Sequence, residues 1–127
     1  MTEPLSPDVT SQWIQAYLVA WASNEPDDIR ALFTPDASYR TEPYADPWVG
    51  PEQIVDGWLD HADSPDSFTF DWAPLAVTGD LSVVEGTTRY ATGTVYSNLW
   101  VIRFASDGRA SAFTEWWMDQ AKASEPN

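Results

Sequence analysis

The sequence predicts an α+β domain in which helices come first and an antiparallel meander of strands comes last. Apolar residues recur at helical spacing up to Leu59, whereas the pattern alternates with a period of two from Phe68 onward. Three short turns, TGD, ATGT and SDGR, divide the alternating part, and each contains the Gly that tight hairpins favour. With 127 residues the chain has the size of one domain, so we expect a single domain over 1–127, with an ordered core at about 6–119 and short tails.

Three helices are predicted before the meander. Ser6 and Pro7 are typical of a helix start, and this helix is expected to end near Ser23. A second helix should begin around Pro26, where acidic residues suit the helix dipole, and should stop at 34–36. Pro51 opens the third helix. The apolar positions at helical spacing are Trp13, Ile14, Tyr17, Leu18 and Trp21, then Ile29, Leu32 and Phe33, then Ile54, Val55, Trp58 and Leu59.

Five segments have the alternation of strands. Residues 37–42 predict a short strand, which the turn-forming loop 43–50 (PYADPWVG) follows. The second half of the chain predicts four consecutive strands at about 68–77, 80–91, 95–105 and 109–119.

The charge of the chain excludes some classes of partner. Twenty acidic residues against six basic ones give a formal net charge of −14, which repels phosphate backbones and anionic membranes. We therefore expect neither a nucleic acid nor a membrane as partner. There is no Cys, no basic-then-apolar leader is visible at 1–10, and no apolar run approaches the roughly 20 residues that span a bilayer. A soluble, cytoplasmic protein is the expectation.

The turns allow a prediction of which side chains share a face of the sheet. If Asp107 and Gly108 form a two-residue loop, Trp100 lies opposite Glu115 on the next strand. If Thr92 and Gly93 do the same, Glu85 lies opposite Trp100 on its other side. The predicted face then has an apolar end, Val83, Ile102, Phe104 and Phe113, and a polar end, Glu85, Thr87, Arg89, Asn98, Trp100, Glu115 and Trp117. The opposite face, with Val84, Thr88, Tyr90, Leu99, Val101, Thr114, Trp116 and Met118, is also rather apolar, so periodicity leaves open which face meets the helices.

Glu115 is the most informative single residue because it interrupts the aromatic stretch FTEWWM. A carboxylate among aromatic rings loses hydration, and this raises its pKa toward the range useful for a general base. The alternative is a structural carboxylate that pairs with Arg89 across the sheet.

Other candidate residues have competing structural interpretations. His61, the only His, lies near the end of the third helix, where an imidazole suits the helix dipole, and a lone His argues little for a metal. Trp48, in the loop 43–50, is a candidate lid, with an exposed loop Trp as the alternative.

Three motifs carry a resemblance to a known family: LFTPDASYRTEP (32–43), VVEGTTRYATG (83–93) and DGRASAFTEWWMD (107–119). With the order helix, helix, strand, helix, meander, they resemble the nuclear-transport-factor-2-like fold, in the branch of SnoaL-like polyketide cyclases and limonene-epoxide hydrolase. The resemblance implies a cone, with three N-terminal helices packed on a curved antiparallel sheet. It also implies that the face with Glu85 and Glu115 points into the cone.

The resemblance further implies roles for individual residues. Glu115 matches the water-activating position of the epoxide hydrolase, Glu85 the acid, Tyr39 the Tyr and Thr41 the Asn that hold the water. The family's bridging Arg is replaced by Val83, so epoxide hydrolysis itself is not carried over.

Two functions follow as hypotheses. The first is a cofactor-independent enzyme, of isomerase, cyclase, dehydratase or hydrolase type, acting on a small, mostly apolar molecule. Glu115 would be the base, Tyr39 the hydroxyl donor and Glu85 the acid. The expected ligand-contacting residues are Trp100, Trp117, Asn98, Arg89, Thr41, Tyr17 and Trp21. The alternative is a non-catalytic ligand-binding or dimerisation module, and in either case Leu99, Val101, Trp116 and Met118 would suit a homodimer interface.

Overall fold

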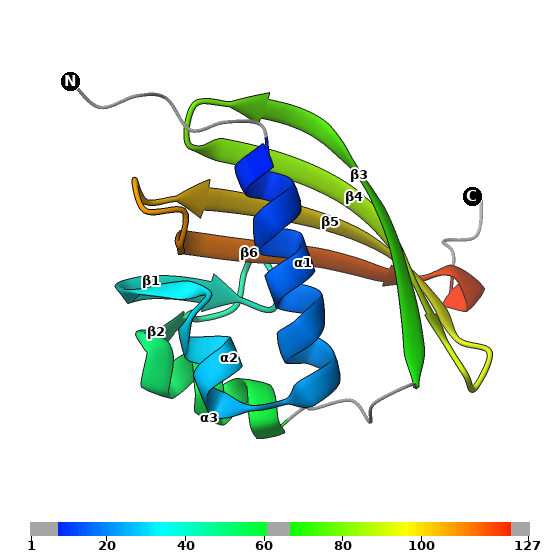
Figure 1. The fold of residues 1–127 in the computed structure, drawn as a ribbon. Helices are drawn as coiled ribbons and strands as arrows, with labels where there is room; N and C mark the ends of the chain where they lie inside the picture. Colours follow the sequence, from blue (N-terminus) through cyan, green and yellow to red (C-terminus); the bar gives the residue numbers. More distant parts are fainter. Residues whose placement is uncertain (1–7, 61–66, 123–127) are drawn as a thin grey trace.

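The protein folds into one curved six-stranded sheet that is covered on one side by helices (Figure 1). The computed structural model describes residues 8–60 and 67–122. The helices are α1 (Asp8–Ser23), α2 (Pro26–Arg30), α3 (Pro51–Asp60) and the short 3-10 helix η1 (Gln120–Lys122). The strands are β1 (Phe33–Arg40), β2 (Trp48–Val49), β3 (Phe68–Thr78), β4 (Leu81–Tyr90), β5 (Val95–Phe104) and β6 (Ala110–Asp119). The predicted α+β class is confirmed.

The strand order in the sheet is β2-β1-β6-β5-β4-β3. Strands β3 to β6 form the predicted antiparallel meander, while β1 runs parallel to β6 and antiparallel to β2. Figure 1 shows α1 crossing the face of this sheet, with α2 and α3 beside β1 and β2. None of the helices within 8–60 and 67–122 combines the length and apolarity that a bilayer crossing needs.

The second helix is shorter than predicted. It ends at Arg30, and Phe33 already begins β1, four residues before the expected strand start. Leu32 and Phe33 were predicted to lie on the apolar side of this helix. Both are buried in the core, but Leu32 lies in the turn and Phe33 in β1. The register of β1 against β6 shifts between Phe33 and Ser38, around Pro35, whose missing N–H cannot join the ladder.

The core lies between α1 and the middle strands. Trp13 and Ile14 of α1 are buried against the sheet, where Ile102 and Phe113 of β5 and β6 are fully enclosed. The Trp13 indole N–H donates to the backbone oxygen of Leu32 at 2.9 Å, so its one polar group is satisfied. The core thus fills the apolar end of the space between α1 and the sheet, and the cavity lies at the polar end.

The register of β5 against β6 agrees with the prediction. Trp100 pairs with Glu115, Ile102 with Phe113, and Asn98 with Trp117. The turn itself differs, because the Ala105 N–H donates to the oxygen of Arg109 around a three-residue loop. A register shift between Arg103 and Phe104 compensates for the extra residue and restores the expected pairs.

The predicted register of β4 against β5 is wrong by one residue. Trp100 pairs with Val84, not with Glu85. The Tyr90 N–H donates to the oxygen of Thr94, so the loop has three residues, and Gly93 adopts φ 98° in the left-handed region that such loops require. A shift of one residue turns every side chain of a strand to the other face. Glu85, Thr87 and Arg89 therefore point away from the helices.

Candidate functional site

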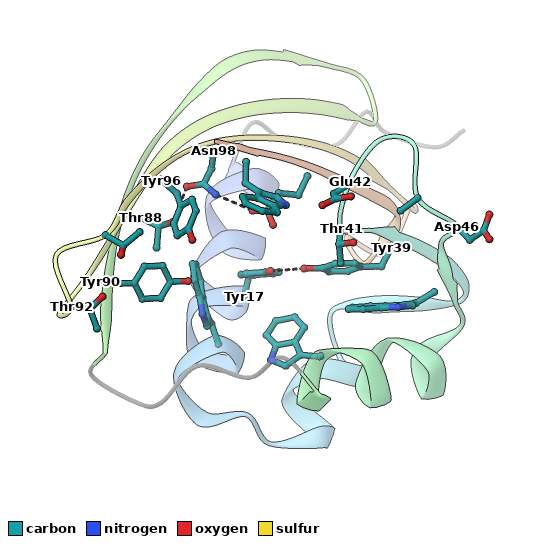
Figure 2. Close-up of a pocket in the computed structure, with 17 residues that line it drawn as sticks. Tyr17, Tyr39, Thr41, Glu42, Asp46, Thr88, Tyr90, Thr92, Tyr96 and Asn98 are labelled. Carbon is teal, nitrogen blue, oxygen red and sulfur yellow. Dashed lines mark hydrogen bonds between the residues drawn. The ribbon is translucent and has the colours of Figure 1, made fainter. Parts of the chain in front are cut away.

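A cavity of about 830 Å³ opens at the polar end of the cone (Figure 2). Its walls come from α1, α3, β1 with the loop that follows it, β2, the β4–β5 hairpin and β6. Eight of its lining residues are aromatic: Tyr17, Trp21, Tyr39, Trp48, Trp58, Tyr90, Tyr96 and Trp117. The carboxylates among them are Glu42, Asp46 and Glu115, and the other polar ones are Thr41, Thr88, Thr92, Thr94 and Asn98.

Glu115 is held in this cavity through one of its two oxygens. Its Oε2 accepts a hydrogen bond from the Trp100 indole N–H at 2.7 Å and another from Asn98 Nδ2 at 3.1 Å. No donor among the described residues bonds Oε1. Every fully buried side-chain polar atom among the described residues has a hydrogen-bond partner. Because Oε1 has none, it is not fully buried, and Glu115 lines the cavity. The carboxyl group is thus oriented by two donors while one oxygen remains available to a ligand.

A second layer of hydrogen bonds fixes these donors. The Thr88 hydroxyl donates to Asn98 Oδ1 at 2.8 Å, and this sets the amide so that its NH₂ group faces Glu115. Trp100 is almost fully buried and stacks on Phe70 with ring centroids 4.7 Å apart. The geometry of the carboxyl group therefore depends on three adjacent strands, β4, β5 and β6.

The environment of Glu115 raises its pKa from 4.5 to about 7. Burial is the main cause, because it penalises the charged form, and the bonds from Trp100 and Asn98 only partly offset it. A carboxyl group with this pKa exchanges protons readily near neutral pH, as general acid-base catalysis requires. No described Arg, Lys or His forms an ion pair with Glu115, so the alternative of pairing with Arg89 is wrong.

Two buried hydroxyl groups lie in the middle of the cavity. Tyr17 of α1 and Tyr39 of β1 share a hydrogen bond of 2.9 Å, in which either oxygen can be the donor, and Figure 2 shows the two hydroxyls facing each other. Burial raises the pKa of both, and the nearby Glu115 charge raises them further. Both hydroxyls therefore stay protonated and one of them has a proton to offer to a ligand oxygen.

The first residue of β2, Trp48, closes one side of the cavity. Trp48 stacks on Tyr39 with ring centroids 5.1 Å apart, and its indole lies directly over Gly57 of α3. Any side chain at Gly57 would collide with that indole, so this position needs Gly for close approach. Trp48, the candidate lid, is thus part of the cavity wall.

The structure gathers most, but not all, of the predicted site residues. Glu115, Tyr39, Thr41, Tyr17, Trp21, Asn98 and Trp117 line the cavity. Glu85 and Arg89 do not, because the one-residue slip of β4 places both on the opposite, exposed face. Trp100 is not a wall either: it lies beneath Glu115 and acts as its hydrogen-bond donor. His61 falls outside the described residues.

The residues that the sequence argument missed come mainly from the hairpin. Thr88 and Tyr90 were placed on the wrong face by the same slip, and Trp58 was assigned only to the core stripe of the third helix. The signal for the hairpin was present, since Gly as third residue of ATG is typical of a three-residue loop. Within the described residues, no group of three or more His, Cys, Asp or Glu side chains could hold a metal ion.

Comparison with known families identifies the chain. The profile of the SnoaL-like domain matches residues 14–116, which include the cavity residues of α1, β1, α3 and β4 to β5 together with Glu115. The chain belongs to the SnoaL-like domain family. No curated protein sequence matches it.

Solved structures agree with this assignment at the level of the fold. A nuclear-transport-factor-2-like protein of unknown function from Burkholderia xenovorans aligns with a TM-score of 0.71 at 17% identity, covering 92% of this chain and 88% of its own. A putative ketosteroid isomerase from Kribbella flavida gives 0.71 at 16% identity, with coverage of 94% and 83%. A steroid delta-isomerase from Pseudomonas aeruginosa gives 0.63 at 21% identity, with coverage of 93% and 85%. This SnoaL-like chain therefore has the cone-shaped, nuclear-transport-factor-2-like fold.

Proposed function

We propose that this SnoaL-like protein is a cofactor-independent enzyme that moves a proton within a small, mostly apolar molecule bound in the cavity. The observation that carries the proposal is the state of Glu115: a carboxyl group without a basic partner among the described residues, held by two donors on Oε2, with Oε1 accessible in an aromatic cavity. A carboxylate kept only for structure would be expected to use both oxygens or to pair with a cation. The name of a steroid delta-isomerase among the similar structures agrees with an isomerase type of reaction.

The chemistry follows from the atoms that face the cavity. Oε1 of ionised Glu115 takes a proton from a carbon next to a ligand carbonyl, and the electron pair of that C–H bond forms a C=C bond. The carbonyl oxygen gains the negative charge, and a hydroxyl of the Tyr17–Tyr39 pair donates a hydrogen bond to it. Glu115 then returns the proton to a different carbon, which completes an isomerisation with no cofactor. Glu85, predicted as the acid, has no part in this scheme because it lies on the other face.

The proposal is tested with a panel of β,γ-unsaturated ketones, whose conversion to conjugated ketones is followed by ultraviolet absorbance. Glu115→Gln keeps an oxygen to accept from Trp100 and Asn98 but removes the base, so we expect a loss of roughly 10²- to 10⁴-fold in rate. Glu85→Gln is the matched control, since it removes the same charge from the exposed face. An active Glu115→Gln variant would exclude Glu115 as the base.

The second candidate is a non-catalytic binding module, and one observation bears on the dimer expected for either function. Trp116 and Met118 of β6 are 40% and 68% exposed on the outer face of the sheet, where Leu99 pairs with Trp116. Apolar side chains of this size gathered on an exposed sheet suit a two-fold contact between copies. Met118→Glu should shift a dimer toward monomer in analytical ultracentrifugation, while an unchanged mass would argue against this face.

A further inference from the structure

The proposed proton transfer leaves part of the cavity unexplained. It uses Glu115 and the two tyrosine hydroxyls, but it gives no role to Glu42 or to the rings of Tyr96 and Trp117. Glu42 follows β1, and Figure 2 shows it beside Thr41 and above Tyr39, at the edge of the cavity. Asp46, which is exposed, lies further out on the same loop.

The positive charges of the chain lie elsewhere. The sequence has five Arg residues and one Lys, and none of the described residues that line the cavity is basic. Arg30, Arg103 and Arg109 form ion pairs with carboxylates outside the cavity. Among the described residues, Glu42, Asp46 and Glu115 have no ion-pair partner. Glu42 raises the pKa of the exposed Tyr44 hydroxyl, a group that supplies no positive charge.

Aromatic rings and carboxylates attract the same kind of ligand. The faces of Trp and Tyr rings carry negative potential, and cages of such rings recognise ammonium and quaternary ammonium groups. Tyr39 stacks on both Trp48 and Phe113, whereas Tyr96 and Trp117 meet each other edge to face. A cavity with such an aromatic lining, with Glu115 inside it and with Glu42 and Asp46 toward its edge, therefore favours a cation electrostatically. A neutral ligand gains only the apolar contacts, and an anionic ligand meets charge of its own sign. The net charge of −14 raises the local concentration of cations further.

We infer that the ligand of this cavity is an organic cation, an apolar molecule that carries a protonated or quaternary amine which Glu42 recognises while the aromatic lining contacts its apolar part. The inference rests on the proposed function, because it assigns the ligand class of the same cavity. In this arrangement Glu42 binds the charge of the ligand, and Glu115 remains the group that exchanges a proton. Glu42 is thus a specificity residue outside the proton-transfer machinery.

The test compares three probes of similar size that carry a positive charge, no charge and a negative charge. Choline and 3,3-dimethylbutan-1-ol have nearly the same shape, since a quaternary nitrogen in one replaces a quaternary carbon in the other, and 3,3-dimethylbutanoate supplies the anion. Binding is measured by NMR titration, with the Asn98 side-chain amide and the Trp117 indole as reporters of the cavity. We expect the Kd of choline to be at least tenfold lower than that of the alcohol, and the anion to bind most weakly.

Two variants distinguish a local cation site at Glu42 from the general electrostatic attraction of the negatively charged protein. Glu42→Gln should raise the Kd of choline by about three- to tenfold without changing that of the alcohol. Glu85→Gln, on the exposed outer face, should change neither, although it alters the net charge equally. Equal weakening by both variants would overturn the local site.

The remaining outcomes distinguish this inference from the proposed function. If the alcohol binds in the cavity as tightly as choline, the preference for a cation is wrong, while a ligand-binding cavity and the proton transfer stand. If none of the three probes shifts the cavity signals, the cation inference fails. Glu115→Gln with the ketone panel then decides the proposed function separately.

Discussion

The raised pKa of Glu115 predicts a specific pH dependence of stability, which Glu115→Gln should remove. The carboxyl group is protonated in the folded protein up to about pH 7, whereas its ordinary pKa is 4.5. Between these two values the folded state binds more protons than the unfolded state, so the free energy of unfolding falls as pH rises. The stabilisation of the folded state by the proton on Glu115 is fully present below about pH 4.5, and it is lost once the pH exceeds about 7.

The size of the effect follows from the same two values. The interval from 4.5 to about 7, at about 1.36 kcal/mol per pH unit, amounts to about 3 kcal/mol. Gln has the shape of Glu, accepts the bonds from Trp100 and Asn98 through one oxygen, and does not titrate. The free energy of unfolding of the wild type, minus that of the variant, should therefore fall by about 3 kcal/mol between about pH 4 and pH 8.

Urea denaturation followed by circular dichroism measures this difference, because the other acidic groups are common to both proteins and cancel. Glu85→Gln, on the exposed face, serves as control. Because this variant keeps Glu115, its free energy of unfolding minus that of Glu115→Gln should show most of the same fall between about pH 4 and pH 8. A difference between wild type and Glu115→Gln that does not change with pH would refute the claim that burial keeps Glu115 protonated.

Four further predictions test the surroundings of the site. Asn98→Ala removes a donor to Glu115 and leaves the Thr88 hydroxyl without its acceptor, so it should cost about 1–3 kcal/mol in urea denaturation and raise the Glu115 midpoint in carbon-13 NMR titration. Tyr39→Phe removes one hydroxyl of the Tyr17–Tyr39 pair but keeps the ring; it should cost about 1 kcal/mol and slow the ketone reaction more than it weakens binding. Gly57→Ala should displace the Trp48 indole, seen as a shift of its NMR signal, and destabilise the fold by about 1–3 kcal/mol. Arg89→Ala should change stability by less than about 0.5 kcal/mol and leave the Glu115 midpoint unchanged, whereas a changed midpoint would contradict the observed register.

The sequence was sufficient for the fold class, because long periodic segments and Gly-containing turns are local signals. It was also sufficient for the pairing of Trp100 with Glu115, although for an incomplete reason. The turn has one residue more than expected, and a bulge at Ser111 of β6 compensates for it. Two deviations of opposite effect left the predicted pairs intact.

No such compensation exists in the β4–β5 hairpin, and the prediction failed there. Whether ATGT contains a two- or three-residue loop depends on whether Gly93 alone takes the left-handed conformation, and both loops use Gly. A single backbone choice therefore decided the face of Glu85, Thr88 and Arg89. The parallel pairing of β1 with β6 was equally out of reach, since these strands are far apart in the sequence and no turn joins them.

The one-sided anchoring of Glu115 has a stereochemical consequence. Both donors lie on the strand next to it and engage the same oxygen, so the carboxyl group cannot rotate by half a turn without breaking two hydrogen bonds. The proton that it carries is confined to Oε1, which approaches a bound molecule from a single direction. A hydrogen taken from one carbon and delivered to another should therefore leave and arrive on the same side of the ligand plane, so the reaction would be suprafacial and its product a single stereoisomer.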